Sequence, residues 1–469
     1  MSFNRRRFVL SCAATSSIAL VALSGTATAQ SSFVSGSSGL FSSDSTPAAP
    51  EAPKNIIYMI GDGMGFNHVS ATNLYETGQT RYQVAGEPGA VEALPGGEAV
   101  QVYEQSEWTQ IAASSYQDGN SYDPARAWSD HNYVNENATD SAAAGTAMAT
   151  GVKTTNGIIG MDPALQPVQN TSEYAIAQGK AAGVVSSVPF NHATPSAWAA
   201  HNSNRNDLHA IGEEMINSDL NVIMGAGHPF YDQDAKPVAT ADEDYMLTSQ
   251  YERLANGETE FTFVEDEADF QALADGNVSS DKYFGLTQVA DTLQHDRSGE
   301  SVTPYDTPQN DVVDLATMSE AALNILNQDE DGFQVMIEGG AIDWAGHAND
   351  EARDIEEVQA FNAAVETVVE WVEENSSWEE TLVIVTADHE TGYLAGPTDD
   401  PAWSAMTGAA GVVPNHNWFS GNHTNQLVPM FVRGTGSEDI VAAADEIDPV
   451  RGKYIDNVEV AQITMNKWW

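Results

Sequence analysis

Short apolar runs, each closed by polar residues, recur along the chain from residue 54 onward. The first is NIIYMI (55–60), which ends at Gly61-Asp62-Gly63, and runs of the same kind occupy 182–188, 221–227, 333–340 and 381–390. Continuous apolar runs of this length are typical of strands buried on both faces of a sheet. We therefore expect each run to form a central strand.

The segment between the last two runs has a different period. Apolar residues recur there at helical spacing, namely Ile355, Val358, Phe361, Val365, Val368, Val369 and Val372. A strand, a helix and a strand at this spacing indicate parallel neighbours joined by a crossover. The pattern thus predicts an α/β fold with a parallel central sheet.

Polar residues that can bind metal ions follow these strand ends. They are Asp62, His192, Thr194, Glu338, Asp343, His347, Asp388 and His389. Taken singly, each has an ordinary explanation: Asp-Gly is a common turn, and Asp343 with His347 is also the spacing of a solvated helical pair. Loops that leave the carboxyl ends of parallel strands meet at one edge of the sheet, however. Eight such groups there suggest a site for more than one divalent cation, such as Zn²⁺ and Mg²⁺.

The N-terminal segment has the features of an export signal. Residues 1–29 hold an arginine cluster, an apolar stretch and the pattern Ala27-Thr28-Ala29, with cleavage expected near Ala29. The cluster Arg5-Arg6-Arg7-Phe8-Val9 matches the twin-arginine type, and an ordinary Sec signal is the alternative. We expect a periplasmic or secreted protein, with 30–52 as a flexible leader. The single cysteine, Cys12, lies in the signal, so any metal site must use His, Asp and Glu.

The net charge is strongly negative. The chain has 68 acidic and 18 basic residues, a formal charge of −50, and loss of the three signal arginines makes it −53. With no basic patch, nucleic acid is not an expected partner, and neither is stable association with a membrane. Because the acids are spread along the chain, they favour a solvated surface adapted to high salt.

Ser141 stands at the head of the small-residue stretch SAAAGTAMAT (141–150). An alanine-rich helix that begins here would direct the serine hydroxyl and its free backbone N–H groups toward an anion. A metal ion could then activate the hydroxyl without a Ser-His-Asp arrangement. The alternative is that Ser141 only caps the helix.

Six sequence blocks resemble the alkaline phosphatases of bacteria and animals. They are IGDGMG (60–65), TDSAAAGTAMATGVKTTNG (139–157), HATPSAWAAHNSNR (192–205), EGGAIDWAGH (338–347), TADHETG (386–392) and GNHT (421–424). The resemblance implies a three-layer α/β/α fold with a large, mainly parallel central sheet. It also implies a homodimer that hydrolyses small phosphomonoesters with two zinc ions and one magnesium ion.

The resemblance also implies a role for each matched residue. Ser141 would be the phosphorylated nucleophile, and Arg205 would bind two oxygens of the phosphoryl group, for which a guanidinium fork has the right shape. The first zinc would be held by Asp343, His347 and His423, and the second by Asp62, Asp388 and His389. The magnesium ion would be held by Asp62, His192, Thr194 and Glu338. His416 is the alternative to His423, which we prefer because it directly precedes a strand-like segment.

Two positions depart from part of the family. Some bacterial members have an aspartate and a lysine where this chain has His192 and Trp344. An imidazole in place of a hard anionic oxygen should weaken the preference of the third site for Mg²⁺. Trp344 borders the substrate site but cannot make the phosphate contact of a lysine, so we expect product phosphate to be held less tightly.

Other functions remain compatible with parts of this pattern. A phosphodiesterase or sulfatase would share the metal ligands, although the chain lacks the Cys or Ser-x-Pro-x-Arg sequence of sulfatase maturation. A secreted binding protein that sequesters metal would need no nucleophile. We expect residues 53–469 to form one domain, with surface insertions at about 79–135, 229–310 and 395–420.

Overall fold

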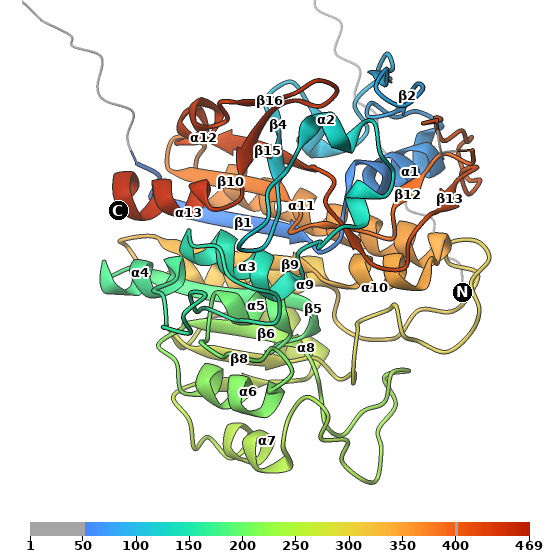
Figure 1. Cartoon of the computed structure of the whole chain (residues 1–469). Helices are drawn as coiled ribbons and strands as arrows, with labels where there is room; N and C mark the ends of the chain where they lie inside the picture. The colour runs from blue at the N-terminus through green and yellow to red at the C-terminus, as the bar shows by residue number, and fades with distance from the viewer. Residues whose placement is uncertain (1–51, 399–401) are drawn as a thin grey trace, which may run out of the picture. The chain divides into compact units, whose positions relative to one another are not determined.

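A computed structural model describes residues 52–398 and 402–469 (Figure 1). The expected export signal and nearly all of the expected leader lie outside these residues. These described residues form one compact unit. No helix within the described ranges combines the length and the apolar character needed to cross a bilayer.

An 11-stranded sheet runs through the centre of this unit. Seven neighbouring strands, from β10 to β7, are parallel, whereas β15 is antiparallel to both β10 and β4. In spatial order the strands are β16 (Glu446–Asp448), β17 (Gly452–Asp456), β4 (Thr109–Ser114), β15 (Val428–Gly434), β10 (Thr381–Thr386), β1 (Asn55–Gly61), β9 (Phe333–Gly339), β5 (Ala181–Pro189), β6 (Val222–Ala226), β8 (Tyr283–Leu286) and β7 (Thr262–Val264).

Helices cover both faces of the sheet, which makes three layers (Figure 1). Helices α9 and α11 pack on one face together with α1 and α8, and α4 and α5 pack on the other with α3. The helices are α1 (Phe66–Thr77), α2 (Pro124–Ala127), α3 (Ser141–Thr150), α4 (Thr171–Ala177), α5 (Ala193–Ala197), α6 (Leu208–Ile216), α7 (Thr248–Ala255), α8 (Glu267–Ala274), α9 (Leu315–Leu326), α10 (Ala341–Ala348), α11 (Glu351–Asn375), α12 (Ser437–Ala443) and α13 (Glu459–Ile463), with short turns at η1 (Val102–Glu104), η2 (Tyr133–Asn135) and η3 (Thr464–Trp468).

The five expected strands are present, and the α/β prediction is confirmed. The expected helix is α11, whose recurring apolar residues are buried against the sheet and α9. The fifth strand is shorter than expected, because β10 ends at Thr386 and Asp388 lies in the loop beyond it. There the Asp388 carboxylate accepts hydrogen bonds from the backbone of Gly63 and His389, which takes this segment out of the sheet.

The segments expected to be surface insertions also contribute to the main sheet. Segment 79–135 supplies β4, and 229–310 supplies β7 and β8 at one edge. These strands have only three to six residues, too few for a clear apolar run.

Three two-stranded sheets lie outside the main one. They pair β11 (Glu390–Thr391) with β14 (His423–Thr424), β12 (Leu394–Ala395) with β13 (Asn417–Trp418), and β2 (Val84–Ala85) with β3 (Glu92–Ala93). The first is joined directly to the loop after β10, so it lies at the carboxyl edge of the parallel strands.

Candidate active site

The N-terminus of α3 presents Ser141 without using its hydroxyl as the cap. Asp140 is the N-cap, and its Oδ1 accepts a hydrogen bond from Ala143 N over 2.9 Å. Ser141 is the first helical residue, is 1% exposed, and its Oγ lies 3.3 Å from His389 Nε2. The alternative that Ser141 only caps the helix is therefore wrong, and its hydroxyl faces a candidate metal ligand.

Close helix packing holds this end of α3 in place. A Cβ atom added to Gly145 would lie 3.1 Å from the Cβ of Ala197 in α5, tighter than most contacts of real Cβ atoms. The alanines of α3 are fully or almost fully buried. The small residues thus let α3 approach α5, the helix that follows His192.

Asp62, Asp388 and His389 form a buried group beside Ser141, here called the inner group. Asp62 follows β1, and the other two follow β10, the neighbouring parallel strand. His389 Nε2 lies 3.1 Å from Asp388 Oδ2 and 3.5 Å from Asp62 Oδ1. Burial raises the pKa of Asp62 well above its usual value, and the carboxylates of Asp388, Asp343 and Glu338 raise it further. Carboxylates this close together in a buried site call for a cation.

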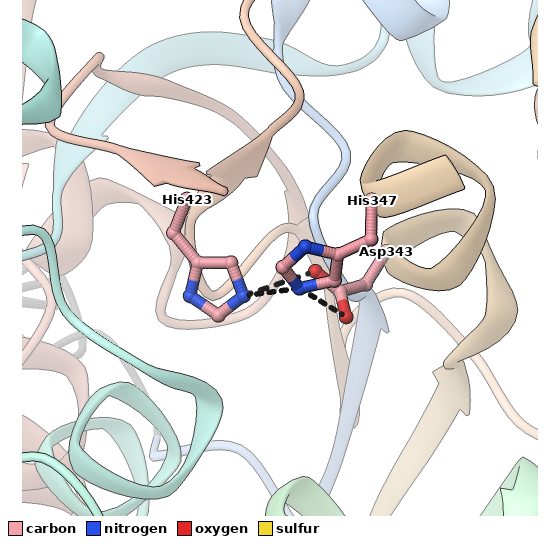
Figure 2. A group of neighbouring side chains, drawn as sticks. All are labelled: Asp343, His347 and His423. Atoms are coloured by element: carbon pink, nitrogen blue, oxygen red, sulfur yellow. Dashed lines mark hydrogen bonds and ion pairs between the residues drawn. The ribbon is translucent and has the colours of Figure 1, made fainter. Parts of the chain in front are cut away.

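Asp343, His347 and His423 form a second group nearer the surface, the outer group (Figure 2). Asp343 and His347 stand one turn apart on α10, and His423 comes from β14. His423 Nε2 lies 3.2 Å from Asp343 Oδ1 and 3.0 Å from His347 Nε2. His416, the alternative to His423, lies elsewhere, with its Nε2 3.5 Å from a carboxylate oxygen of Glu351.

The hydrogen bonds of the two histidines fix which nitrogen faces the centre of the outer group. His347 Nδ1 bonds the carbonyl of Gly421, and His423 Nδ1 bonds that of Thr139, each over 2.8 Å. Because a carbonyl only accepts, each Nδ1 carries a proton and each Nε2 is available as a donor of electrons to a metal. Although burial opposes it, the Asp343 carboxylate raises the pKa of His423 to about 9 when no metal is present. The Asp343 carboxylate therefore attracts positive charge strongly to the centre of the outer group.

The third expected set consists of His192, Thr194 and Glu338 together with Asp62. Its His, Asp and Glu ligand atoms lie farther apart than those of the inner and outer groups. Thr194 Oγ1 donates to Asp62 Oδ2 over 3.3 Å, and Ser186 donates to Glu338 Oε2. Burial raises the pKa of Glu338 to about 7, and burial together with Arg205 lowers that of His192 to about 3. Within the described residues, only the inner and outer groups bring three ligand atoms of His, Cys, Asp or Glu within 4.8 Å of one another.

Arg205 and Trp344 lie in the wall of a pocket of about 990 Å³ in front of these groups. Arg205 Nη1 is 3.0 Å from Asp140 Oδ2, so the residue that caps α3 also orients the guanidinium. The Trp344 ring meets the His192 ring edge to face, with centroids 5.7 Å apart. Ser141 and His423 line the same pocket, which therefore joins the expected nucleophile, the outer group and the expected phosphate-binding arginine.

Sequence reasoning missed several residues of the site. Thr391 Oγ1 donates to Asp343 Oδ1 over 2.5 Å and lies 3.3 Å from His389 Nδ1, so it contacts both groups. Thr391 lies in the block TADHETG, two positions after His389. Its place in a matched block is the feature of the sequence from which it could have been found. Phe419 and His295 also line the pocket, and neither belongs to a recognisable block.

Comparisons with known proteins identify the family of the chain. The alkaline phosphatase family model matches residues 98–425. Alkaline phosphatase 3 of Bacillus subtilis is 28% identical over 91% of this chain and 79% of its own length, and that of Escherichia coli is 27% identical over 84% of each. Alkaline phosphatase 4 of Bacillus subtilis is 33% identical, over 57% of this chain and 53% of its own length.

Solved structures show the same fold. The cold-active alkaline phosphatase of Shewanella sp. has a TM-score of 0.62 at 23% identity, covering 88% of this chain and all of that one. The alkaline phosphatase of the Antarctic bacterium TAB5 has a TM-score of 0.61 at 24% identity, covering 89% of this chain and all of that one. Since the family model spans more than two thirds of the sequence, the chain belongs to the alkaline phosphatase family.

Proposed function

We propose that this protein hydrolyses phosphate monoesters to an alcohol and inorganic phosphate, with Ser141 as the nucleophile. The observation that carries the proposal is the position of the Ser141 hydroxyl, which is 3.3 Å from His389 and in the same pocket as Arg205. Family membership supports the reaction class.

The residues present fit divalent metal ions. Four buried atoms of the expected ligands have no hydrogen-bond partner within the described chain, namely Asp62 Oδ1, His192 Nδ1, Glu338 Oε1 and Asp388 Oδ2. An unpartnered buried polar atom is costly unless an ion or a water molecule satisfies it. We infer that the inner and outer groups each hold a zinc ion and that Asp62, His192, Thr194 and Glu338 hold a magnesium ion. When bound, such ions supply positive charge that lowers the pKa of a nearby hydroxyl and stabilises charge on the entering and leaving oxygens.

The chain's own residues then direct two in-line displacements. Ser141 Oγ attacks phosphorus, the ester P–O bond breaks, and the alcohol departs. Water next attacks the phosphoserine, which releases inorganic phosphate and returns the serine hydroxyl. Arg205 binds two non-bridging oxygens throughout, and Asp140 fixes the plane of its guanidinium. Two displacements predict retention of configuration at phosphorus.

Phosphate trapping tests the nucleophile. Incubation with labelled inorganic phosphate, followed by acid quench, should leave label on Ser141. Ser141→Ala at the same zinc content should lose roughly 10³-fold or more in kcat, because the nucleophile is removed while the metal ligands stay. Label on a histidine, or an active enzyme without label, contradicts the proposal.

Comparing ester classes separates the alternatives. An aryl phosphate should be hydrolysed faster than the matching aryl phosphodiester or aryl sulfate, because Arg205 suits a terminal phosphate. A protein that only sequesters metal would bind zinc equally well as wild type and as the Ser141→Ala variant, and neither form would release phosphate.

We further propose that the protein is exported, acts in the periplasm or outside the cell, and forms a homodimer. The signal-like sequence of residues 1–29 supports export, and the family resemblance supports the dimer. Light scattering of the purified protein tests the dimer, and N-terminal sequencing of exported protein tests cleavage near Ala29.

A further inference from the structure

A buried histidine that the proposed reaction does not use lies directly behind the site. His68 stands in the first turn of α1 and is fully buried. Its Nδ1 is 2.6 Å from Asp354 Oδ1 in α11, and its Nε2 is 3.5 Å from Glu390 Oε1 in β11. The histidine thus connects two helices with the small ribbon formed by β11 and β14.

The partners of His68 indicate a positive charge. Nε2 lies 3.0 Å from the Thr391 carbonyl, which only accepts, so this nitrogen carries a proton. Nδ1 faces a carboxylate that is itself fully buried. Although burial opposes it, Asp354 and Glu390 raise the pKa of His68 well above its usual value. An imidazolium at this position pairs with Asp354 through Nδ1 and places a positive charge beside Glu390.

The β11–β14 ribbon carries or adjoins one candidate ligand of each metal group. Glu390 pairs with Thr424 and Thr391 pairs with His423, and Glu390 directly follows His389. The rings of His389 and His423 stack with centroids 3.7 Å apart. A shift of this ribbon would therefore move a ligand of the inner group and a ligand of the outer group together.

Glu390 ties the two strands of the ribbon to each other. Its Oε2 accepts from the Thr424 hydroxyl, and its Oε1 accepts from Leu394 N over 3.0 Å. The neighbouring Thr391 reaches forward to Asp343. Hydrogen bonds thus run without a gap from Asp354 through His68 and the ribbon to a candidate ligand.

The loop after β1 is packed closely against this arrangement. A Cβ atom at Gly65 would lie 2.3 Å from Glu390 Cγ, and one at Gly63 would lie 2.9 Å from Thr391 Oγ1. Only glycine leaves room for these side chains. The ribbon is therefore fixed from behind by the same loop that carries Asp62.

We propose that His68, with Asp354 and Glu390, is a positioning residue that sets the place of the β11–β14 ribbon and so the spacing of His389 and His423. The inference rests on the proposed function only in taking the inner and outer groups to bind zinc. Without the imidazole, two buried carboxylates would face each other across an empty space, and their repulsion would displace the ribbon.

Zinc affinity of the full-length protein tests the proposal. Metal-free wild type, His68→Ala and Glu390→Gln are titrated with zinc against a chromophoric chelator, and kcat and melting temperature are measured with saturating zinc. We expect both variants to bind zinc roughly 10- to 100-fold more weakly, the usual effect of changing a residue that orients a metal ligand. Saturating zinc should restore most of kcat, because every atom in contact with substrate remains.

His228→Ala is the matched control. His228 is also buried, with its Nε2 2.9 Å from Glu265, but its partners belong to the segments around α7 and β7. It should lower the melting temperature and leave zinc affinity as in wild type. If His68→Ala folds poorly, the zinc affinity of Glu390→Gln tests the proposal instead, because this substitution keeps the shape of the side chain. Zinc affinity equal to wild type in these variants overturns the positioning role, whereas a wild type that binds no zinc overturns the proposed function itself.

Discussion

Asp140 shows how one residue can serve two parts of a site. Its Oδ1 caps α3 and so leaves the Ser141 hydroxyl available, and its Oδ2 holds Arg205 and accepts from Gly157 N. If Ser141 were itself the N-cap, its hydroxyl would accept a hydrogen bond from a backbone N–H of α3. The proposed nucleophile and the proposed phosphate-binding arginine are thus held by the same residue.

His192 allows a test of the third metal position. Its Nε2 lies 3.5 Å from Arg205 and its Nδ1 is buried without a partner, so the ring offers one nitrogen and no negative charge. His192→Asp should bind Mg²⁺ more tightly, by roughly tenfold, because a hard anionic oxygen replaces a nitrogen donor. The measurement is the Mg²⁺ concentration that gives half of the maximal activation at fixed zinc. An unchanged midpoint would show that His192 is not a ligand.

Hydrogen bonds between residues that are far apart in the sequence could not be predicted from local patterns. The strand-end rule predicted Asp62, Asp388 and His389 because each follows an apolar run. It could not find His68, whose partner Asp354 is 286 positions away. The role of Thr391 likewise depends on α10 lying beside β11, which no local pattern shows.

Among the secondary-structure elements, those buried on both faces were predictable and the short ones were not. The strands β1, β9 and β10 are continuous apolar runs because both faces are covered by helices. Strand β16 has three residues, two of them exposed, so neither its length nor its polarity identifies it. Short edge strands bury too few apolar side chains to produce a recognisable hydrophobic pattern in the sequence.

Helix α11 contains a carboxyl group that should make stability depend on pH. Burial raises the pKa of Glu357 from 4.5 to about 7, with His295 opposing the shift. Between these two values the folded state holds a proton that the unfolded state has lost, so the free energy of unfolding falls as pH rises. Glu357→Gln removes the ionisable group and with it this loss of stability at high pH. It should leave stability unchanged near pH 4.5 and raise it above pH 7, by at most about 3 kcal/mol.

Urea unfolding at pH 5 and pH 8 measures this effect, with saturating zinc in all samples. Glu370→Gln, an exposed position of the same helix, is the control and should give the same small difference at both pH values. A stability difference between Glu357→Gln and wild type that does not grow with pH would show that Glu357 is already ionised in the folded protein at pH 5.

The charge of the whole molecule opposes the substrate that its site should bind. A chain at −50 repels a dianionic ester over a Debye length of roughly 10 Å at 0.1 M salt, but only about 3 Å at 1 M. Close to the site, the proposed metal ions and Arg205 should attract the ester. Salt should therefore assist the approach of substrate more than the chemistry.

We expect kcat/KM for a dianionic aryl phosphate to rise between about 0.1 and 1 M NaCl, through KM more than through kcat. Circular dichroism at each salt concentration controls for refolding of a chain loosened by its own repulsion. With constant ellipticity, a kcat/KM that is flat or falls would mean that long-range repulsion does not limit the reaction.

The order of strands in the main sheet also bears on how the protein is made. Strand β1 is synthesised first but lies between β9 and β10, which leave the ribosome more than 250 and more than 300 residues later. At 5–20 residues per second, the unpaired backbone groups of β1 wait roughly 15–70 s for their partner strands. During this time β1 is open to non-native pairing, which a chaperone that shields nascent chains would prevent. His423 emerges later still, so the complete outer group can form only near the end of translation, and the metal ion that we propose for it would bind to a nearly finished chain.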